Sequence, residues 1–439
     1  MDIIVIGAGI AGITTAYSLH TAGHRVCVIE RQTTVAQKAS FGHGGVILPT
    51  PFDTWFGPEL SFSSWPAWLG GESTRVRFSK NLRNCSWTRR FFKQPSSEQC
   101  LARYARLKPL IDLSSLTLAE IETRHAFEFE QRTGILHLFR HASELKRIAP
   151  ALLFLKQHEH PYQLLNAEEC YQAEPSIPLQ PPLAGGILLP DDRSANCPLF
   201  AKQLKQVLEE AGVRFLLGRK VARIDPALAR VELEPPHHHS ASALSSLPNQ
   251  TFESMTADAI VLTAGTGSLP LLAQAGVRLP LQLMQLHTII APIAYEERAP
   301  HLTLIDTVQH ITMARFNNRL RVAGGIVGPR LKQAQFNLNH TLRQQTLNKV
   351  AHAVHNWLPG ITKLSTGSYW DGQKLLSPDG LPIVGATAHP RLWVNLAHGP
   401  VGWALTCGAA KALADQLTGQ ACELDADTLM ALSPTRFER

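Results

Sequence analysis

The chain has 439 residues, 44% of them hydrophobic and 18% charged, which excludes a disordered, collagen-like or coiled-coil protein and leaves room for two or three folding units. Its 42 Lys and Arg residues exceed its 35 Asp and Glu residues but are scattered along the chain, so we expect no nucleic-acid partner. Seven cysteines without CxxC spacing disfavour a disulfide framework or structural zinc and favour a reducing, cytoplasmic location. No apolar run reaches the roughly 18 residues of a transmembrane helix.

A strand, a glycine-rich turn and a helix open the chain. Residues 3–6 are an apolar β-branched run typical of a buried parallel strand, and Gly7, Gly9 and Gly12 follow in GxGxxG spacing. In such a unit the first glycine permits the turn, the second lets a pyrophosphate approach the backbone, and the third lets helix and strand pack closely. Apolar residues at helical spacing over 13–19 predict the helix, whose N-terminus favours a bound phosphate.

A second strand completes this unit. Residues 26–29 are again apolar, and Glu30 stands at their end. Its carboxylate can accept hydrogen bonds from an adenosine ribose, and no arginine replaces it to favour a 2′-phosphate. The sequence therefore predicts a bound dinucleotide, and this unit alone leaves FAD and NAD open.

Two further segments favour FAD. Residues 392–396 predict a strand, and a glycine-rich turn over 397–402 leads from it into an apolar helix. The N-terminus of that helix would stabilise the negative charge that develops on a reduced flavin ring. Residues 258–265 predict another buried strand that ends in an Ala-Gly pair beside a ligand-sized space.

Short motifs in a fixed order give the chain a resemblance to a known family. It resembles the D-amino-acid oxidase/dehydrogenase superfamily of FAD enzymes, and within it the bacterial D-amino-acid dehydrogenase small subunits. The motifs stand at 39–49, 82–85, 134–139, 162–165, 185–192, 198–200, 315–319, 377–385 and 398–403.

The resemblance implies an α/β fold with a Rossmann-type FAD-binding domain and an interleaved α+β substrate domain built on an antiparallel sheet. The FAD-binding domain would be discontinuous, over 1–55, 180–270 and 365–439, and the substrate domain would take 56–179 and 271–364. It also implies the cofactor-binding residues, with Val221 acting through its backbone on the adenine or serving only as core. They are Gly7, Gly9, Ile10, Ala11, Gly12, Glu30, Arg31, Ser40, His43, Gly44, Gly45, Val46, Val221, Ala264, Gly265, Gly399, Val401, Gly402 and Trp403.

Two groups of histidines have alternative interpretations. Some members of the superfamily bond a histidine of the 40–46 loop to the flavin 8α carbon, so His43 is either such a covalent ligand or a hydrogen-bonding residue beside the cofactor. Residues 237–239 are three adjacent histidines in a polar segment, and we interpret them as a solvated loop rather than a metal site, because sequence neighbours rarely converge on one ion.

An amino-acid substrate needs a cation for its carboxylate, and guanidinium offers a bidentate geometry that ammonium lacks. By resemblance the candidates are Arg315, which otherwise is a solvated strand-edge charge, and Lys374, where the family commonly has an arginine. His287 is a third candidate for substrate contact, with an ordinary strand histidine as the alternative. Both Lys374 and the altered segment 283–287 depart from the family pattern, which puts amino-acid specificity in doubt more than flavin binding.

The predicted activity is FAD-dependent oxidative deamination of an amine, foremost a D-amino acid. Hydride would pass to flavin N5, and the resulting imine would hydrolyse to a 2-oxo acid and ammonia. The alternatives are an enzyme for a secondary, N-methylated or pathway-specific amine and a non-catalytic flavin-binding subunit. The resemblance further implies a quinone or respiratory electron acceptor and peripheral association with the cytoplasmic face of the inner membrane.

Overall fold

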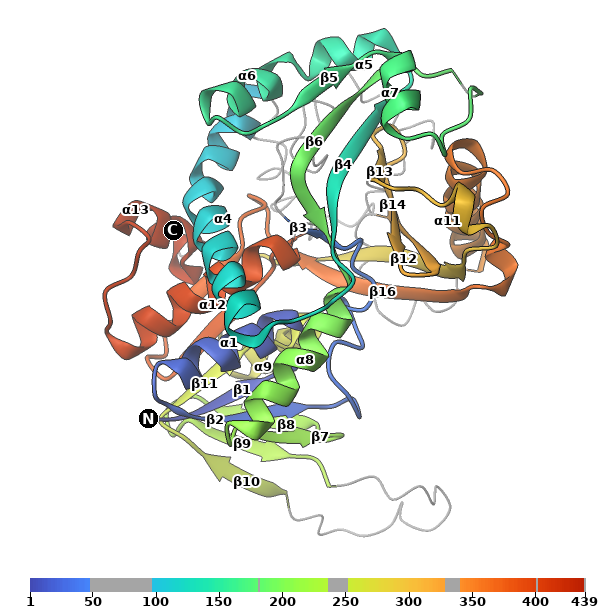
Figure 1. Cartoon of the computed structure of the whole chain (residues 1–439). Helices are drawn as coiled ribbons and strands as arrows, with labels where there is room; N and C mark the ends of the chain where they lie inside the picture. The colour runs from blue at the N-terminus through green and yellow to red at the C-terminus, as the bar shows by residue number, and fades with distance from the viewer. Residues whose placement is uncertain (48–96, 181, 236–251, 328–339, 400–401, 438–439) are drawn as a thin grey trace.

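A six-stranded sheet of strand order β17-β18-β11-β1-β2-β7 forms the base of the molecule in a computed structural model that describes residues 1–47, 97–180, 182–235, 252–327, 340–399 and 402–437 (Figure 1). Its strands pair in parallel except for the β17–β18 edge. The strands are β1 (Asp2–Ile6), β2 (Arg25–Glu30), β7 (Arg214–Leu217), β11 (Ala259–Leu262), β17 (Ile383–Ala386) and β18 (Leu392–Leu396).

Alternating side chains of β1 and β2 belong to two hydrophobic cores, one on each face of this sheet. Ile3 and Val5 belong to a core shared with α1 (Ile10–Thr21), α8 (Cys197–Glu210) and α12 (Gly402–Thr418). Ile4 and Ile6 face a second core formed with a three-stranded sheet and α9 (Ser268–Gln274). The three strands are β8 (Val221–Asp225), β9 (Arg230–Leu233) and β10 (Glu253–Thr256). This is the doubly covered arrangement expected of a Rossmann-type domain.

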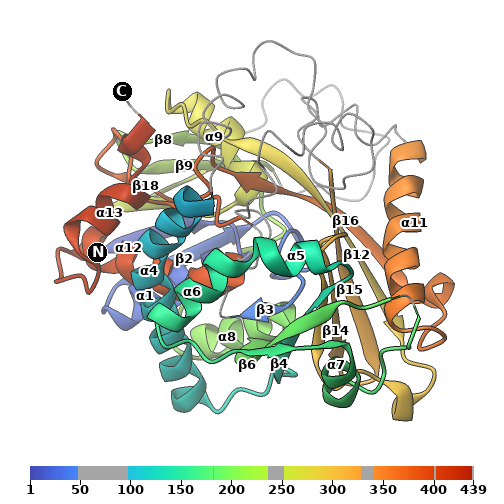
Figure 2. The same ribbon diagram turned by 90° about the horizontal axis from the view of Figure 1, so that it is seen from above.

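A larger, mostly antiparallel sheet lies above this domain, and its only parallel pair among the described strands is β4–β13 (Figures 1 and 2). Its order is β16-β12-β15-β14-β13-β4-β6-β3, with β5 paired to β6. The strands are β3 (Val46–Ile47), β4 (Arg132–Phe139), β5 (Gln163–Leu165), β6 (Gly185–Ser194), β12 (Gln282–Pro292), β13 (Thr303–Asp306), β14 (Ile311–Phe316), β15 (Arg319–Val327) and β16 (Ser368–Leu376).

The two faces of the larger sheet have different neighbours. Ile289, Met313 and Val322 pack against α11 (His340–Trp357), which covers one face. The opposite face carries Thr288, whose hydroxyl bonds the Gly42 carbonyl, so it faces the loop that follows β2. The remaining helices are α4 (Ser97–His125), α5 (Ala142–Arg147), α6 (Ala149–Gln157), α7 (Ala167–Ala173) and α13 (Ala426–Leu432).

The local elements that the sequence predicted are present. The helix after the GxGxxG turn is α1, the strand over 258–265 is β11, and the C-terminal strand and helix are β18 and α12. The second substrate segment, 271–364, contains strands such as β12 and β15 of an antiparallel sheet, and helix α11, which ends at Trp357.

The division into domains differs from the predicted boundaries at four elements. Strands β3, β6 and β16 fall inside predicted FAD-binding segments but pair within the larger sheet. Helix α4, assigned to the substrate domain, packs on α12, where a Cβ added to Gly408 would lie 2.7 Å from the carbonyl oxygen of Leu110. The predicted histidine loop at 237–239 lies outside the described residues.

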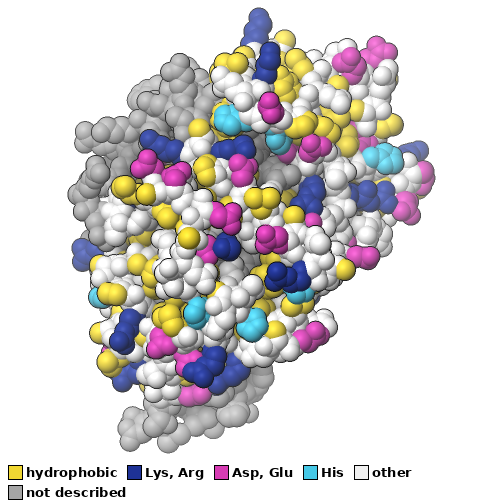
Figure 3. All heavy atoms as spheres, turned by 60° about the vertical axis from the view of Figure 1, so that its left-hand side comes forward, with side chains coloured by type: hydrophobic (Ala, Val, Ile, Leu, Met, Phe, Trp, Pro, Cys, Tyr) yellow, Lys and Arg dark blue, Asp and Glu magenta, His cyan; other side chains and the backbone are white. Residues whose placement is uncertain are grey.

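None of the helices in the described part of the chain has the length and hydrophobicity needed to span a bilayer. On the face shown in Figure 3, Lys and Arg side chains are interspersed with Asp and Glu, so that face has no continuous basic patch.

Candidate functional site: a dinucleotide cavity between two glycine turns

The turn between β1 and α1 leaves no room for side chains at two of its glycines. Gly7 has a φ of +106°, and a Cβ there would lie 2.5 Å from the Cα of Ala264. A Cβ on Gly12 would lie 1.8 Å from the carbonyl oxygen of Gly7. The geometry therefore requires glycine at both positions: Gly7 for the turn and Gly12 for close packing of the helix on the strand, as predicted.

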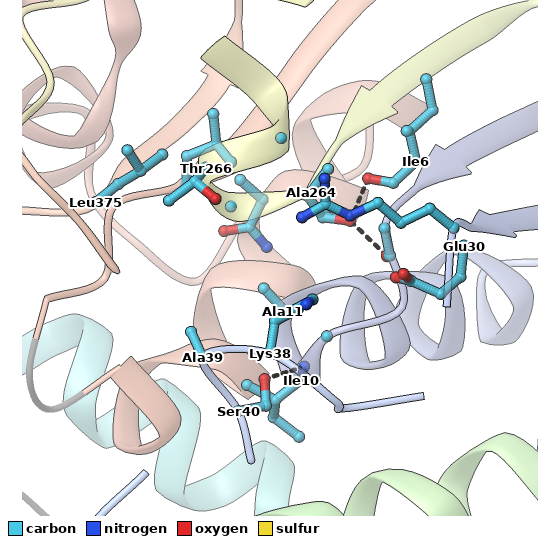
Figure 4. Close-up of a pocket in the computed structure, with 18 of the residues that line it drawn as sticks. Ile6, Ile10, Ala11, Glu30, Lys38, Ala39, Ser40, Ala264, Thr266 and Leu375 are labelled. Atoms are coloured by element: carbon cyan, nitrogen blue, oxygen red, sulfur yellow. Dashed lines mark hydrogen bonds between the residues drawn. The ribbon is translucent and has the colours of Figure 1, made fainter. Parts of the chain in front are cut away.

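Two side chains hold this turn from outside it. The Glu30 carboxylate accepts hydrogen bonds from the backbone N–H of Ala8 at 2.7 Å and of Gln32 at 2.9 Å. The Ser40 hydroxyl accepts from the buried N–H of Ile10 at 2.9 Å, at the start of α1 (Figure 4). Each interaction fixes a residue that the sequence predicted to bind the cofactor.

One cavity is lined both by this turn (Figure 4) and by the second glycine turn before α12; we call it the nucleotide cavity. It passes the ends of β1, β2, β8, β11 and β18, the place where ligands bind open α/β sheets. The predicted cofactor residues that line it are Gly7, Gly9, Ile10, Ala11, Glu30, Arg31, Ser40, His43, Val221, Ala264, Gly265, Gly399, Gly402 and Trp403.

His43 joins the loop after β2 to the N-terminus of α12. Its ring is 4% exposed; Nδ1 accepts from the N–H of Gly45 at 3.0 Å, and Nε2 lies 3.4 Å from the N–H of Trp403. The imidazole also stands edge-on to the Trp403 indole, with ring centroids 6.1 Å apart. These contacts match the hydrogen-bonding alternative for His43, and the covalent link stays a prediction.

Other predicted cofactor residues lie off the cavity wall. Gly12 lies beneath the turn, and Gly44 lies beside Thr312, whose side chain would be 3.5 Å from a Cβ added to that glycine. Gly45 faces Phe316, and Val46 pairs with Ser194 in β3 and β6. Gly44, Gly45 and Val46 do not line the cavity in the described structure. They lie where the chain passes from the six-stranded sheet to the larger sheet. Val401 lies outside the described residues.

A polar pair at the second turn, a half-buried His398 and a buried Asn395, was missed from the sequence. His398 Nε2 lies 2.7 Å from Oδ1 of Asn395, whose amide donates to the hydroxyl of Thr15. Burial lowers the pKa of His398 to about 4, so its imidazole is neutral near pH 7. Asn395 and His398 both line the nucleotide cavity. A polar Asn within the apolar strand 392–396 was the available signal.

The three substrate candidates separate in space. Lys374, on β16, lines the nucleotide cavity next to Gln373 and Leu375. Arg315 does not line it: its guanidinium donates to Glu296 at 2.6 Å and to the carbonyl of Asn317 at 2.9 Å. Because strand side chains alternate, Arg315 and Ala314 lie on opposite faces of β14. Arg315 is on the face that points away from the 40–46 loop.

His287 is also outside the cavity wall. Its Nδ1 contacts the hydroxyl of Tyr369, and its neighbour Thr288 is the residue that reaches the Gly42 carbonyl. A one-residue step along a strand reverses the face, so the predicted substrate contacts of Arg315 and His287 are not supported by this geometry.

The arginine that does reach the loop is Arg321, from the neighbouring strand β15. Its Nη1 donates to the carbonyls of Phe41 and His43. Trp370 packs on the same loop so closely that a Cβ on Gly42 would lie 1.8 Å from its ring. Sequence reasoning missed these residues because the face of each strand could not be assigned without the sheet register.

The cavity fits FAD on this chain's own geometry. Gly7 and Gly9 of the first turn line it without side chains, and the fixed Glu30 carboxylate stands on its wall at the end of β2. Two helix N-termini, those of α1 and α12, border the cavity, and such termini favour negative charge on phosphate and on a reduced ring.

Comparison with known proteins agrees with this geometry. The family model described as FAD dependent oxidoreductase (DAO) matches residues 2–416, so the chain belongs to this family of FAD-dependent oxidoreductases. A D-amino acid dehydrogenase of Cereibacter sphaeroides is 32% identical over 98% of this chain and 94% of its own length. One from Bradyrhizobium diazoefficiens is 29% identical over 98% of both chains.

Solved structures share the fold. Glycine oxidase from Geobacillus kaustophilus superposes with a TM-score of 0.67 at 18% identity, covering 99% of this chain and 98% of that one. L-amino acid deaminase from Proteus myxofaciens gives 0.69 at 15% identity, covering 100% and 94%. These structures confirm the α/β fold expected from the sequence, and the family match confirms the FAD cofactor.

Proposed function

We propose that this enzyme oxidises the amine of a D-amino acid. The substrate would lose two electrons and two protons, one from carbon and one from nitrogen, to give an imine, and water would convert the imine to a 2-oxo acid and ammonia. The observation that carries the proposal is the meeting, in one cavity, of a dinucleotide turn, the N-terminus of α12 and the cation of Lys374. The full-length similarity to D-amino acid dehydrogenases supports it.

Bound FAD supplies the two-electron acceptor for this reaction. The chain's own residues position and stabilise it: Gly7 and Gly9 admit the pyrophosphate, Glu30 binds the ribose, and the α12 N-terminus faces developing negative charge. Lys374 provides a positive charge for the substrate carboxylate. Neutral His398 keeps a second positive charge away from the α12 turn near pH 7.

A panel of substrates tests the proposal. Purified enzyme is mixed with D-amino acids, their L-enantiomers and N-methylated amines, with a dye as electron acceptor, and the 2-oxo acid and ammonia are quantified. We expect turnover with D-amino acids, and we expect the 2-oxo acid and ammonia to form in equal amounts. Turnover with the L-enantiomers alone would contradict the proposal.

A secondary or N-methylated amine is the second candidate. Its support is the absence of an arginine clamp among the described residues: Arg315 pairs with Glu296, and Lys374 stands where a guanidinium was expected. In the same panel, this candidate predicts dye reduction by N-methylated amines and none by D-amino acids.

The electron acceptor and the cellular location are further parts of the proposal. We propose a quinone or other respiratory acceptor, reached by an enzyme of the cytoplasm that associates peripherally with the inner membrane. Comparing soluble quinone analogues with oxygen as acceptors for the substrate-reduced enzyme tests this, and faster reoxidation by oxygen would contradict it.

A further inference from the structure

A second cavity lies between α8 and the open face of the larger sheet; we call it the interdomain cavity. Its volume is about 690 Å³, within the range of small-molecule sites. None of its described lining residues lines the nucleotide cavity, and Phe41 of the loop after β2 stands at its wall. The other lining residues are Glu130, Asn196, Pro198, Leu199, Lys202, Ile290, Ala291, Pro292, Asn318, Arg319, Arg321, Thr366 and Ser368.

Positive charge exceeds negative charge on this wall. Lys202, Arg319 and Arg321 face a single acid, Glu130, among the described lining residues. The Glu130 carboxylate already accepts from Arg319 at 2.8 Å and from the Asn196 amide at 2.6 Å. Lys202 forms no ion pair with any residue that the structure describes. The cavity therefore has cations without matching acids in the described part of its wall.

Arg321 carries the buried positive charge with which an anionic ligand would pair. Its side chain is 5% exposed, its Nη1 is bonded only to backbone carbonyls, and its buried Nε has no acceptor within the described chain. Burial lowers the pKa of this guanidinium to about 10, and the charge of Glu130 offsets only part of that desolvation. Buried charges in proteins are ordinarily paired, because an unpaired charge in a low-dielectric interior is costly.

The rest of the wall specifies the kind of anion. Phe41, Leu199 and Ile290 are apolar, and Pro198 and Pro292 add further apolar surface. The Thr366 and Ser368 hydroxyls donate to backbone carbonyls and the Asn196 amide donates to Glu130, so the cations of the wall are the donors for an anion. A compact inorganic ion would leave the apolar part of the wall uncovered, whereas a carboxylate on an apolar body would use both parts.

We propose that the interdomain cavity is a binding site for a small organic carboxylate, whose anionic end contacts Arg321 and Lys202. The site is separate from the amine-oxidising one and does not depend on that activity. Because Arg321 also holds the carbonyls of Phe41 and His43, a ligand on Arg321 would be coupled to the loop that lines the nucleotide cavity.

Calorimetric titration of the FAD-loaded full-length protein with phenylacetate tests the site. We expect binding to weaken at least about tenfold in Lys202→Glu, since a cation of the wall is replaced by an acid. The matched control is Lys205→Gln, on the same helix, whose ammonium pairs with Glu209; it should retain the wild-type affinity.

Inorganic phosphate serves as the compact anion and should bind at least about tenfold more weakly than phenylacetate. Absence of phenylacetate binding, unchanged affinity in Lys202→Glu, an equal loss in the Lys205→Gln control, or equal binding of phosphate would each overturn the proposal. The amine panel is read separately, so failure of either proposal leaves the other intact.

Discussion

The hydroxyl of Ser40 accepts the buried backbone N–H of Ile10 at 2.9 Å, which ties the loop after β2 to the first turn of α1. The same loop bonds to the larger sheet through Thr288 and Arg321 and approaches α12 through His43. One short segment thus connects the two sheets and both helix N-termini that border the nucleotide cavity. Its geometry determines how the cofactor is held.

Replacing Ser40 by Ala should weaken FAD binding. The buried Ile10 N–H would lose its acceptor, and an unsatisfied buried donor costs about 1–3 kcal/mol. Titration of apoprotein with FAD measures the effect, expected as a roughly fivefold to hundredfold higher Kd. Ser143→Ala, at an exposed position of α5, is the control. An unchanged Kd in Ser40→Ala would show that this bond does not support the site.

Gly12→Ala should disrupt the first turn. The new Cβ would lie 1.8 Å from the Gly7 carbonyl oxygen, so α1 must move away from β1, at a cost of about 1–3 kcal/mol or more. We expect a lower melting temperature and loss of FAD. Gly44→Ala is the control because its Cβ would meet Thr312 at an ordinary 3.5 Å. Equal behaviour of the two variants would count against the close-packing role of Gly12.

Lys374→Met should lower kcat/KM for D-amino acids at least about tenfold, mainly through KM, because a charge-assisted bond to the substrate carboxylate is lost. Lys374→Arg should retain activity, since guanidinium can bind a carboxylate bidentately. Steady-state kinetics with a dye acceptor measure both variants. If the Met variant has wild-type KM and kcat, Lys374 does not bind the substrate.

Arg315→Gln should leave the kinetics nearly unchanged. Its side chain is 11% exposed and donates to Glu296, which is 81% exposed, and to the carbonyl of Asn317, so these contacts lie outside the nucleotide cavity. The variant should therefore keep its KM, whereas loss of this part-buried pair should lower the urea concentration at which it unfolds. A large rise in KM would return Arg315 to the substrate site and contradict the placement described above.

His398 should make stability depend on pH. Its pKa is about 4 in the folded protein against 6.5 ordinarily, so the unfolded chain binds the proton more readily. The stability associated with the neutral ring is fully present above about pH 6.5 and is lost as the pH falls toward 4. Between pH 7 and 5 the loss is about 2 kcal/mol, at about 1.4 kcal/mol per pKa unit.

Urea unfolding at pH 7 and pH 5 measures this loss. His398→Gln should reduce the difference between the two pH values, whereas His355→Gln, at an exposed position of α11, should not. An identical pH dependence in the wild type and His398→Gln would rule out the assignment.

Local patterns were sufficient to predict the dinucleotide unit. The GxGxxG spacing, the apolar runs and Glu30 act over short stretches of chain, where propensity and turn sterics dominate. The second turn before α12 followed from the same logic. Both features now line one cavity.

The substrate side could not be predicted in the same way. Whether Arg315 or Arg321 faces the 40–46 loop depends on the register of the strands. A shift of one residue moves every side chain of a strand to the other face of the sheet. That register is set by pairing between strands distant in sequence, such as Ile290 of β12 with Arg321, which single-sequence patterns do not contain. The predicted domain boundaries missed that β6 and β16 pair within the larger sheet for the same reason, because their strand partners lie far away in the sequence.

Anaerobic mixing of the purified protein with D- and L-enantiomers of one amino acid tests the central claim most directly. The account predicts that FAD bound at one per chain loses its visible absorbance with the D-enantiomer and keeps it with the L-enantiomer. A colourless protein that takes up no FAD on reconstitution, or a flavin that no amine bleaches, would contradict it.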